Sequence, residues 1–228
     1  MISNKILFMR YLLIFILPVF FFACSSTSKV SSDTQSPSSN DSAKEELYWS
    51  RVDSAKMAFS EADVQFMTMM IGHHAQALVM SRLAPENGAS PQVQTLASRI
   101  INGQQDEIHT MQQWLSKRNQ PTVDIKIDGL RLMINGMRSG HMDMVGMLSR
   151  KQLEDLSQAR GKEFDRLFLK YMIGHHQGAV VMVDNLIKTE NGAREEAAFR
   201  LASGINADQK TEIDRMQRML NDLKASLQ

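Results

Sequence analysis

Two histidine pairs, His73-His74 and His175-His176, are the residues whose type and spacing best suit chemistry. Adjacent side chains of an α-helix point about 100° apart, so an isolated pair does not chelate an ion, whereas side chains three, four or seven positions away share a face. A methionine occurs four residues before the second histidine and seven residues after the first in both regions. The predicted metal ligands are therefore His73, His74, Met70, Met80, His175, His176, Met172 and Met182.

The metal follows from the softness of these ligands. Imidazole nitrogen together with thioether sulfur favours a copper ion as the cofactor, and the thioether selects Cu(I); other transition metals stay as alternatives. Cys24 is the single cysteine, so the chain cannot form a cluster of thiolates. A third methionine group predicts an accessory metal site at His141, Met142 and Met144, although an amphipathic connector that uses methionine as filler explains the same residues.

A structural role is the alternative for the histidines, because a histidine on an apolar helical face is commonly a hydrogen-bonded core residue. Several neighbouring positions differ between the two regions, namely Thr68/Lys170, Met69/Tyr171 and Gln76/Gly178, while the histidines and their predicted methionine partners are the same. Packing alone would tolerate leucine in place of methionine. The pattern thus favours a metal role.

A glutamine and a glutamate, three residues apart, recur downstream of each histidine pair. They are Gln104 and Glu107 in the first region and Gln209 and Glu212 in the second. They are expected either to orient the imidazoles through hydrogen bonds or to join neighbouring helices. The Glu-x-x-His motif of di-iron bundles does not occur, and His109, which has no counterpart, is expected at the surface.

The histidine regions belong to a duplicated unit. Residues 63–80 and 165–182 share ten of 18 positions without a gap, and the tetrapeptide Glu-Asn-Gly-Ala follows each of them. Each unit is predicted to form two helices. Ser60 caps the first helix, and Ser90 followed by proline begins the second. In the second unit we expect helices over about 162–188 and 194–223.

Residues 119–160 connect the two units and resemble neither of them. We expect an extended segment over 122–127, a short helix over 130–137 and an amphipathic piece near 152–159. Two helical hairpins that each bury one face should pack together. The predicted fold class is all-α, an antiparallel four-helix bundle built from unit one at about 60–118, unit two at about 161–226 and a methionine-rich crossover.

The N-terminal residues predict export. Residues 1–23 form a secretory signal peptide, with two basic residues before an apolar run that is too short for a membrane span of roughly 20 residues. The run ends in a small residue before Cys24, as in bacterial lipoproteins, so Cys24 is the predicted lipidation site. Residues 24–44 form a flexible tether and 45–228 the helical domain. We expect a lipoprotein of the bacterial cell envelope, facing the periplasm or the cell exterior, with the membrane as a partner through its lipid anchor.

Composition and motifs exclude several classes of function. The 26 Lys and Arg residues nearly balance the 25 Asp and Glu residues, and only 7% of residues are aromatic, so no nucleic-acid partner is expected. Neither a nucleophile motif of the G-x-S-x-G type nor a phosphate-binding glycine loop occurs.

The second unit resembles the DUF305 family, and the resemblance extends over about residues 61–220. The matching residues are Phe168-Leu169, Met172-Ile173, His175-His176, Gly178-Ala179, Met182, Gln209, Glu212, Ile213 and Met216, preceded by Gly146-Met147, Gly161 and Phe164-Asp165. The first unit has Ala75-Gln76 where the family usually shows Gln-Gly. The resemblance implies a ferritin-like, exported helical protein, and it supports copper because some members bind copper and aid copper resistance.

The leading hypothesis is an exported, lipid-anchored metal-binding protein that buffers or transports copper. One alternative is a ferritin-like metal oxidase, which needs an open coordination position and turnover with O₂. Another is a structural or interaction lipoprotein without a metal. The sequence leaves open whether the histidine pairs form one site or two, and whether the chain is a homo-oligomer.

Overall fold

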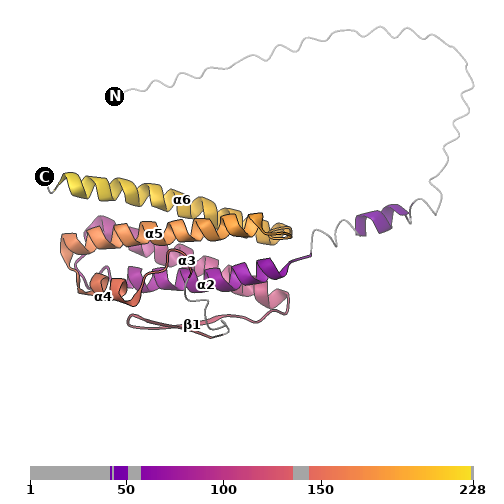
Figure 1. Ribbon diagram of the computed structural model, residues 1–228, viewed down its shortest axis with the longest axis horizontal. Coiled ribbons are helices and arrows are strands. Elements are labelled where there is room, and N and C mark those ends of the chain that lie inside the picture. Colours follow the sequence, from indigo (N-terminus) through magenta and orange to yellow (C-terminus); the bar gives the residue numbers. More distant parts are fainter. Residues whose placement is uncertain (1–41, 43, 51–57, 136–143, 227–228) are drawn as a thin grey trace, which may run out of the picture. The chain divides into compact units, whose positions relative to one another are not determined.

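The computed structural model describes residues 42, 44–50, 58–135 and 144–226 (Figure 1). Four long helices dominate this part of the chain: α2 (Glu61–Arg82), α3 (Pro91–Lys117), α5 (Gly161–Lys188) and α6 (Glu196–Ala225). A short helix, α4 (Arg150–Gln158), and two strands, β1 (Asp124–Asp128) and β2 (Arg131–Asn135), lie between α3 and α5 in the chain. The predicted signal peptide, Cys24, His141 and Met142 fall outside the described residues.

Side-chain caps set where the first two long helices begin. The hydroxyl of Ser60 accepts a hydrogen bond from the backbone of Asp63, and the Asp63 carboxylate accepts one from the backbone of Ser60, which satisfies two amides of the first turn. Ser90 caps α3 and is followed by proline at the first helical position. Both predicted caps are confirmed.

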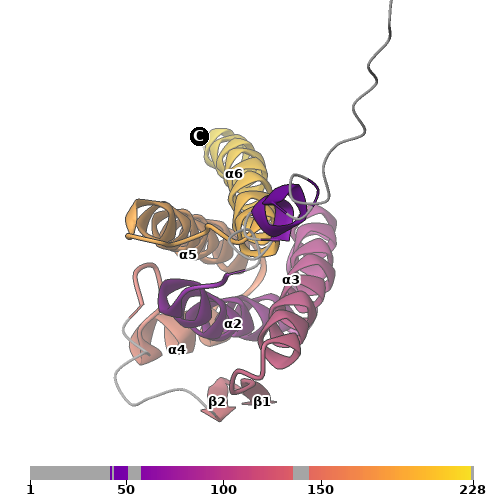
Figure 2. The same ribbon diagram turned by 90° about the vertical axis from the view of Figure 1, so that its right-hand side faces the viewer.

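The helices pack as two hairpins joined through their first helices. In the ribbon viewed in Figure 2, α2 lies against α3, α5 lies against α6, and α2 contacts α5. Two buried carboxylates fasten each hairpin to the other. Asp63 on α2 accepts a hydrogen bond from the backbone of Ala193 at 2.7 Å, in the turn before α6, and Asp165 on α5 accepts one from the backbone of Ser90 at 3.1 Å, in the turn before α3. The N-terminal end of each of these two helices therefore lies near the C-terminal end of the other, so α2 and α5 are antiparallel.

The connecting segment contains a β-hairpin where a helix was predicted. The expectation of an extended segment over 122–127 agrees with β1, but the predicted short helix over 130–137 is wrong, because residues 131–135 form β2, antiparallel to β1. Gly129 takes φ +56° in the two-residue turn, and the paired strands place Ile125 opposite Ile134. Alternation of apolar and polar residues on both sides of a two-residue turn that begins with glycine is typical of a hairpin, and it outweighed the helical pattern.

Helix α4 confirms the amphipathic piece expected near 152–159. Its C-terminal end is bound by Asn87, which lies in the turn after α2. The side-chain amide of Asn87 donates hydrogen bonds to the carbonyls of Leu156, Ser157 and Ala159, at 2.9–3.1 Å. These carbonyls belong to the last turn of α4 and its end, where helical partners run out. Among the described residues, no helix combines the length and the apolar character needed to cross a membrane.

Candidate metal centre

The four paired histidines lie together at the middle of the contact between α2 and α5. All four side chains have 0% exposure. The rings of His73 and His175, one from each helix, stack with their centroids 3.9 Å apart and their planes tilted by 37°. Within each pair the rings diverge, with centroid separations of 6.5 and 6.1 Å, as the helical geometry of adjacent residues requires. The structure thus brings together imidazoles that are 102 positions apart in the chain.

A glutamate holds the second histidine of each pair. Nε2 of His74 lies 2.7 Å from a carboxylate oxygen of Glu107, and Nε2 of His176 lies 2.6 Å from a carboxylate oxygen of Glu212. The glutamates come from α3 and α6, so each contact joins the two helices of one hairpin. A carboxylate bound to one ring nitrogen fixes the orientation of the ring, and the other nitrogen, Nδ1, takes no part in this contact.

The first histidine of α2 is held by the loop that precedes α4. Nε2 of His73 donates a hydrogen bond to the carbonyl oxygen of Val145 at 3.1 Å. The loop approaches α5 so closely that a Cβ atom on Gly178 would overlap this same carbonyl. On the other side, the amide of Gln76 donates to the carbonyl of Leu148 at 3.0 Å and accepts from its backbone N–H at 2.7 Å. Gly178 and Gln76 occupy equivalent positions of the two units. The glycine leaves space for the loop on α5, and the glutamine binds the loop on α2.

Five ring nitrogens at the centre are buried without a hydrogen-bond partner. They are Nδ1 of all four histidines and Nε2 of His175. A buried polar atom left without a partner costs roughly 1–3 kcal/mol, so such atoms are rare in folded proteins unless they serve a further purpose. A neutral imidazole that donates through Nε2 carries a lone pair on Nδ1, which is the form that ligates a metal. The donor set therefore fits a transition-metal ion.

The environment keeps the stacked pair neutral. Burial lowers the pKa of His73 to about 3, and the neighbouring His74 lowers it further against the effect of the Val145 carbonyl. Burial also lowers the pKa of His175 well below its ordinary value, with His73 as the next cause. Protons consequently do not compete for these two lone pairs at neutral pH.

The four predicted methionine ligands flank the histidines in two apolar clusters. Met70 of α2 and Met182 of α5 pack in one cluster, and Met80 of α2 and Met172 of α5 pack in the other. Each cluster thus receives one thioether from either helix, on opposite sides of the histidines along the helix axes. The sequence spacing placed these residues on the buried face, and their role as ligands stays a prediction.

The side chains are not arranged as a closed metal cage. Across the described ranges, no three His, Cys, Asp or Glu side chains converge at ligand distance. Of the predicted accessory site only Met144 is described, and it packs in the same apolar cluster as Met70. The accessory site therefore also stays a prediction, and His109 is exposed as expected.

The glutamine–glutamate motif divides into two parts. Glu107 and Glu212 contact the histidines, whereas Gln104 and Gln209 are buried and form no hydrogen bond with a histidine ring. The sequence did not predict the contact of His73 with Val145. A backbone carbonyl is present in every residue, so the residue type does not indicate which carbonyl will accept a hydrogen bond. The only signal was Gly146, which follows Val145 with φ +85°.

Comparison with known proteins identifies the family and several similar structures. Residues 63–220 match the family model described as Domain of unknown function (DUF305). A solved DUF305 fragment from Deinococcus radiodurans is 29% identical, with a TM-score of 0.60, and the match covers 72% of this chain and 98% of that one. A predicted secreted DUF305 protein from Streptomyces coelicolor is 27% identical, with a TM-score of 0.58 and coverage of 72% and 92%.

A third group of similar structures carries metals. CopM in its Cu(I)-bound form is 28% identical, with a TM-score of 0.54, and the match covers 70% of this chain and 96% of that one. The same protein has been solved in Cu(II)-bound and Ag-bound forms. A comparison with the curated proteins finds no significant match.

Proposed function

The chain belongs to the DUF305 family, and on that premise we propose that it is an exported metal-binding protein whose cargo is copper, which it buffers or transports. The observation that carries this proposal is the set of buried ring nitrogens without partners, above all the four Nδ1 atoms. Nε2–H groups engaged by Glu107, Glu212 and Val145 leave lone pairs on the opposite nitrogens.

The proposed ligands are the Nδ1 atoms of His73, His74, His175 and His176, with the thioethers of Met70, Met80, Met172 and Met182 as additional donors. Thioether sulfur binds Cu(I) in preference to harder ions, and neutral imidazole suits copper in both oxidation states. The similar structures of CopM with Cu(I) and Ag support a soft monovalent ion for this chain as well, and the Cu(II)-bound form supports imidazole ligands. Because the rings are stacked and not preset as a cage, loading requires them to turn apart.

The proposal includes the arrangement of the whole chain. We infer that residues 1–23 are a signal peptide, that Cys24 carries lipid, and that residues 24–44 tether the domain of residues 45–228 to a membrane of the cell envelope. The four long helices then form an antiparallel, ferritin-like bundle outside the cytoplasm. The similar protein of Streptomyces coelicolor, which is described as a predicted secreted protein, supports export.

Titration of the purified protein with Cu(I) against a competing chelator tests this function. The wild-type protein should bind Cu(I) stoichiometrically, and the double variant His74→Ala/His176→Ala should lose most of this affinity. His109→Ala is the matched control, because His109 is exposed and its ring forms a hydrogen bond with Gln113 and not with the centre. Unchanged binding by the double variant would remove these two histidines from the site, and absence of Cu(I) binding by the wild type would overturn the function.

A further inference from the structure

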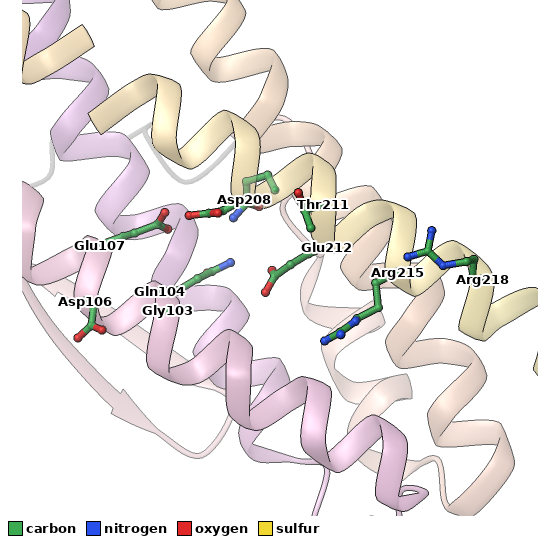
Figure 3. Close-up of a pocket in the computed structure, with 10 residues that line it drawn as sticks. Gly103, Gln104, Asp106, Glu107, Asp208, Thr211, Glu212, Arg215 and Arg218 are labelled. Carbon is green, nitrogen blue, oxygen red and sulfur yellow. The ribbon is translucent and has the colours of Figure 1, made fainter. Parts of the chain in front are cut away.

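A second group of ionisable side chains lines a cavity of about 570 Å³ between α3 and α6 (Figure 3). It contains four carboxylates and two guanidinium groups, those of Asp106, Glu107, Asp208, Glu212, Arg215 and Arg218. In Figure 3 the carboxylates of Glu107, Asp208 and Glu212 lie toward the space between the helices, whereas that of Asp106 points away from it. Even without Asp106, three carboxylates face the two guanidinium groups, so the cavity has a negative charge.

Asp208 adds a third carboxylate close to those of Glu107 and Glu212. The equivalent position of the first unit is Gly103, so the duplicated pattern does not account for this carboxylate. Asp208 faces both of the glutamates that hold the histidines. Partial burial raises its pKa, and the charges of Glu107 and Glu212 raise it further. Carboxylates that repel one another in this way gain free energy from a cation placed between them.

Two buried glutamines that line the cavity have side-chain amide atoms without a hydrogen-bond partner. Gln104 is 2% exposed, and neither the oxygen nor the nitrogen of its side-chain amide has a hydrogen-bond partner. Gln209 is 1% exposed, and its amide oxygen also lacks a partner. Both residues line the cavity. Buried amides of this kind are normally satisfied, so their free oxygens point to a ligand that the cavity accepts.

We propose that this cavity is a second cation site, which holds a hydrated divalent cation through the carboxylates of Glu107, Asp208 and Glu212. Its donors are all oxygen, in contrast to the nitrogen and sulfur of the histidine centre, and oxygen suits hard cations such as Mg²⁺, Mn²⁺ and Ca²⁺.

The ion binds with its water shell. No three acidic or histidine side chains of the described residues converge at ligand distance, so the carboxylates reach the ion through its waters. The cavity has room for this shell, since a water molecule takes up about 30 Å³ in the liquid. Mg²⁺ and ions like it usually keep several waters in proteins. The site stands whether or not the histidines bind copper.

Paramagnetic broadening by Mn²⁺ in amide NMR spectra of the ¹⁵N-labelled protein tests the site. We expect selective broadening of the signals of Gly103 and Asp208, which line the cavity on opposite helices. Asp208→Asn should raise the Mn²⁺ concentration for half-maximal broadening about tenfold, because one of three charges is lost. Asp106→Asn, which removes the same charge from a side chain that points away, should leave it unchanged. Broadening that avoids the cavity, or an equal effect of the two variants, would overturn the proposal.

Two further measurements test the binding mode of the ion and separate this proposal from the copper function. Hexaamminecobalt(III), whose ligands do not exchange, should displace Mn²⁺ if the ion is held through its shell, and failure to compete would refute the hydrated mode. Cu(I) titration of Asp208→Asn should match the wild type. A wild-type protein that binds Mn²⁺ in the cavity but no Cu(I) would refute the proposed function alone, and the reverse result would refute the cation site alone.

Discussion

Acid should destabilise the copper-free protein because of two buried histidines. The pKa of His73 is lowered by burial to about 3, and that of His175 is lowered well below 6.5. In the unfolded chain both rings take up a proton near pH 6.5. Between pH 6.5 and about 3 the unfolded state therefore binds more protons than the folded state, so the free energy of unfolding falls as the pH falls through this window.

The size of the effect follows from the same linkage. A histidine that titrates near 6.5 in the unfolded chain and stays neutral in the folded one costs about 2 kcal/mol at about pH 5, so His73 and His175 together cost about 4 kcal/mol. Domains typically have about 5–15 kcal/mol of stability, so this loss is large. Urea unfolding followed by circular dichroism at about pH 7 and about pH 5 measures it directly.

Variants identify the residues responsible for this pH dependence. His175→Leu should remove about half of the difference between the two pH values, because one neutral buried ring is lost. His109→Asn should retain the full difference, since His109 is exposed. Equal stability of the wild-type protein at the two pH values would refute the reasoning, because it would mean that the stacked rings accept protons in the folded state.

Three further variants probe the supports of the centre. Gly178→Ala should lower the free energy of unfolding by about 1–3 kcal/mol in urea, since its methyl group overlaps the loop, whereas Gly174→Ala, with no atom within 4 Å, should not show this loss. Asn87→Ala should cost about 1–3 kcal/mol in the same assay, as three carbonyls lose their donor. Glu107→Gln should weaken Cu(I) binding about 10–100-fold in chelator competition, because His74 loses its carboxylate, and an unchanged affinity would exclude this support.

The long helices could be predicted from the sequence because their apolar residues recur with the helical period over more than 20 positions. The helices expected over about 162–188 and 194–223 agree with α5 and α6 to within two residues at each end. Short segments carry less information. Residues 130–137 contain too few residues to separate the two periods, and the turn at Gly129 decided the outcome.

The candidate site was predictable in its residue types and not in its contacts. Periodicity indicates which side of a helix is buried, but it does not indicate which side chain arrives from the neighbouring element. The stacking of His73 on His175 depends on the antiparallel placement of α2 and α5, which long-range contacts set. Asp208 was missed because the comparison of the two units directs attention to positions that agree, and its counterpart is Gly103.

The connecting loop makes two equivalent histidines unequal. A chain with two similar units has only one connection, so that connection can cross the centre on one side only. Gln76 binds the loop where the second unit has Gly178, which lets the loop approach. As a result Nε2 of His73 is held by the backbone carbonyl of Val145, whereas the loop makes no such contact with His175. If copper enters between these rings, as we propose, it therefore meets one imidazole that the loop fixes and one that the loop does not fix.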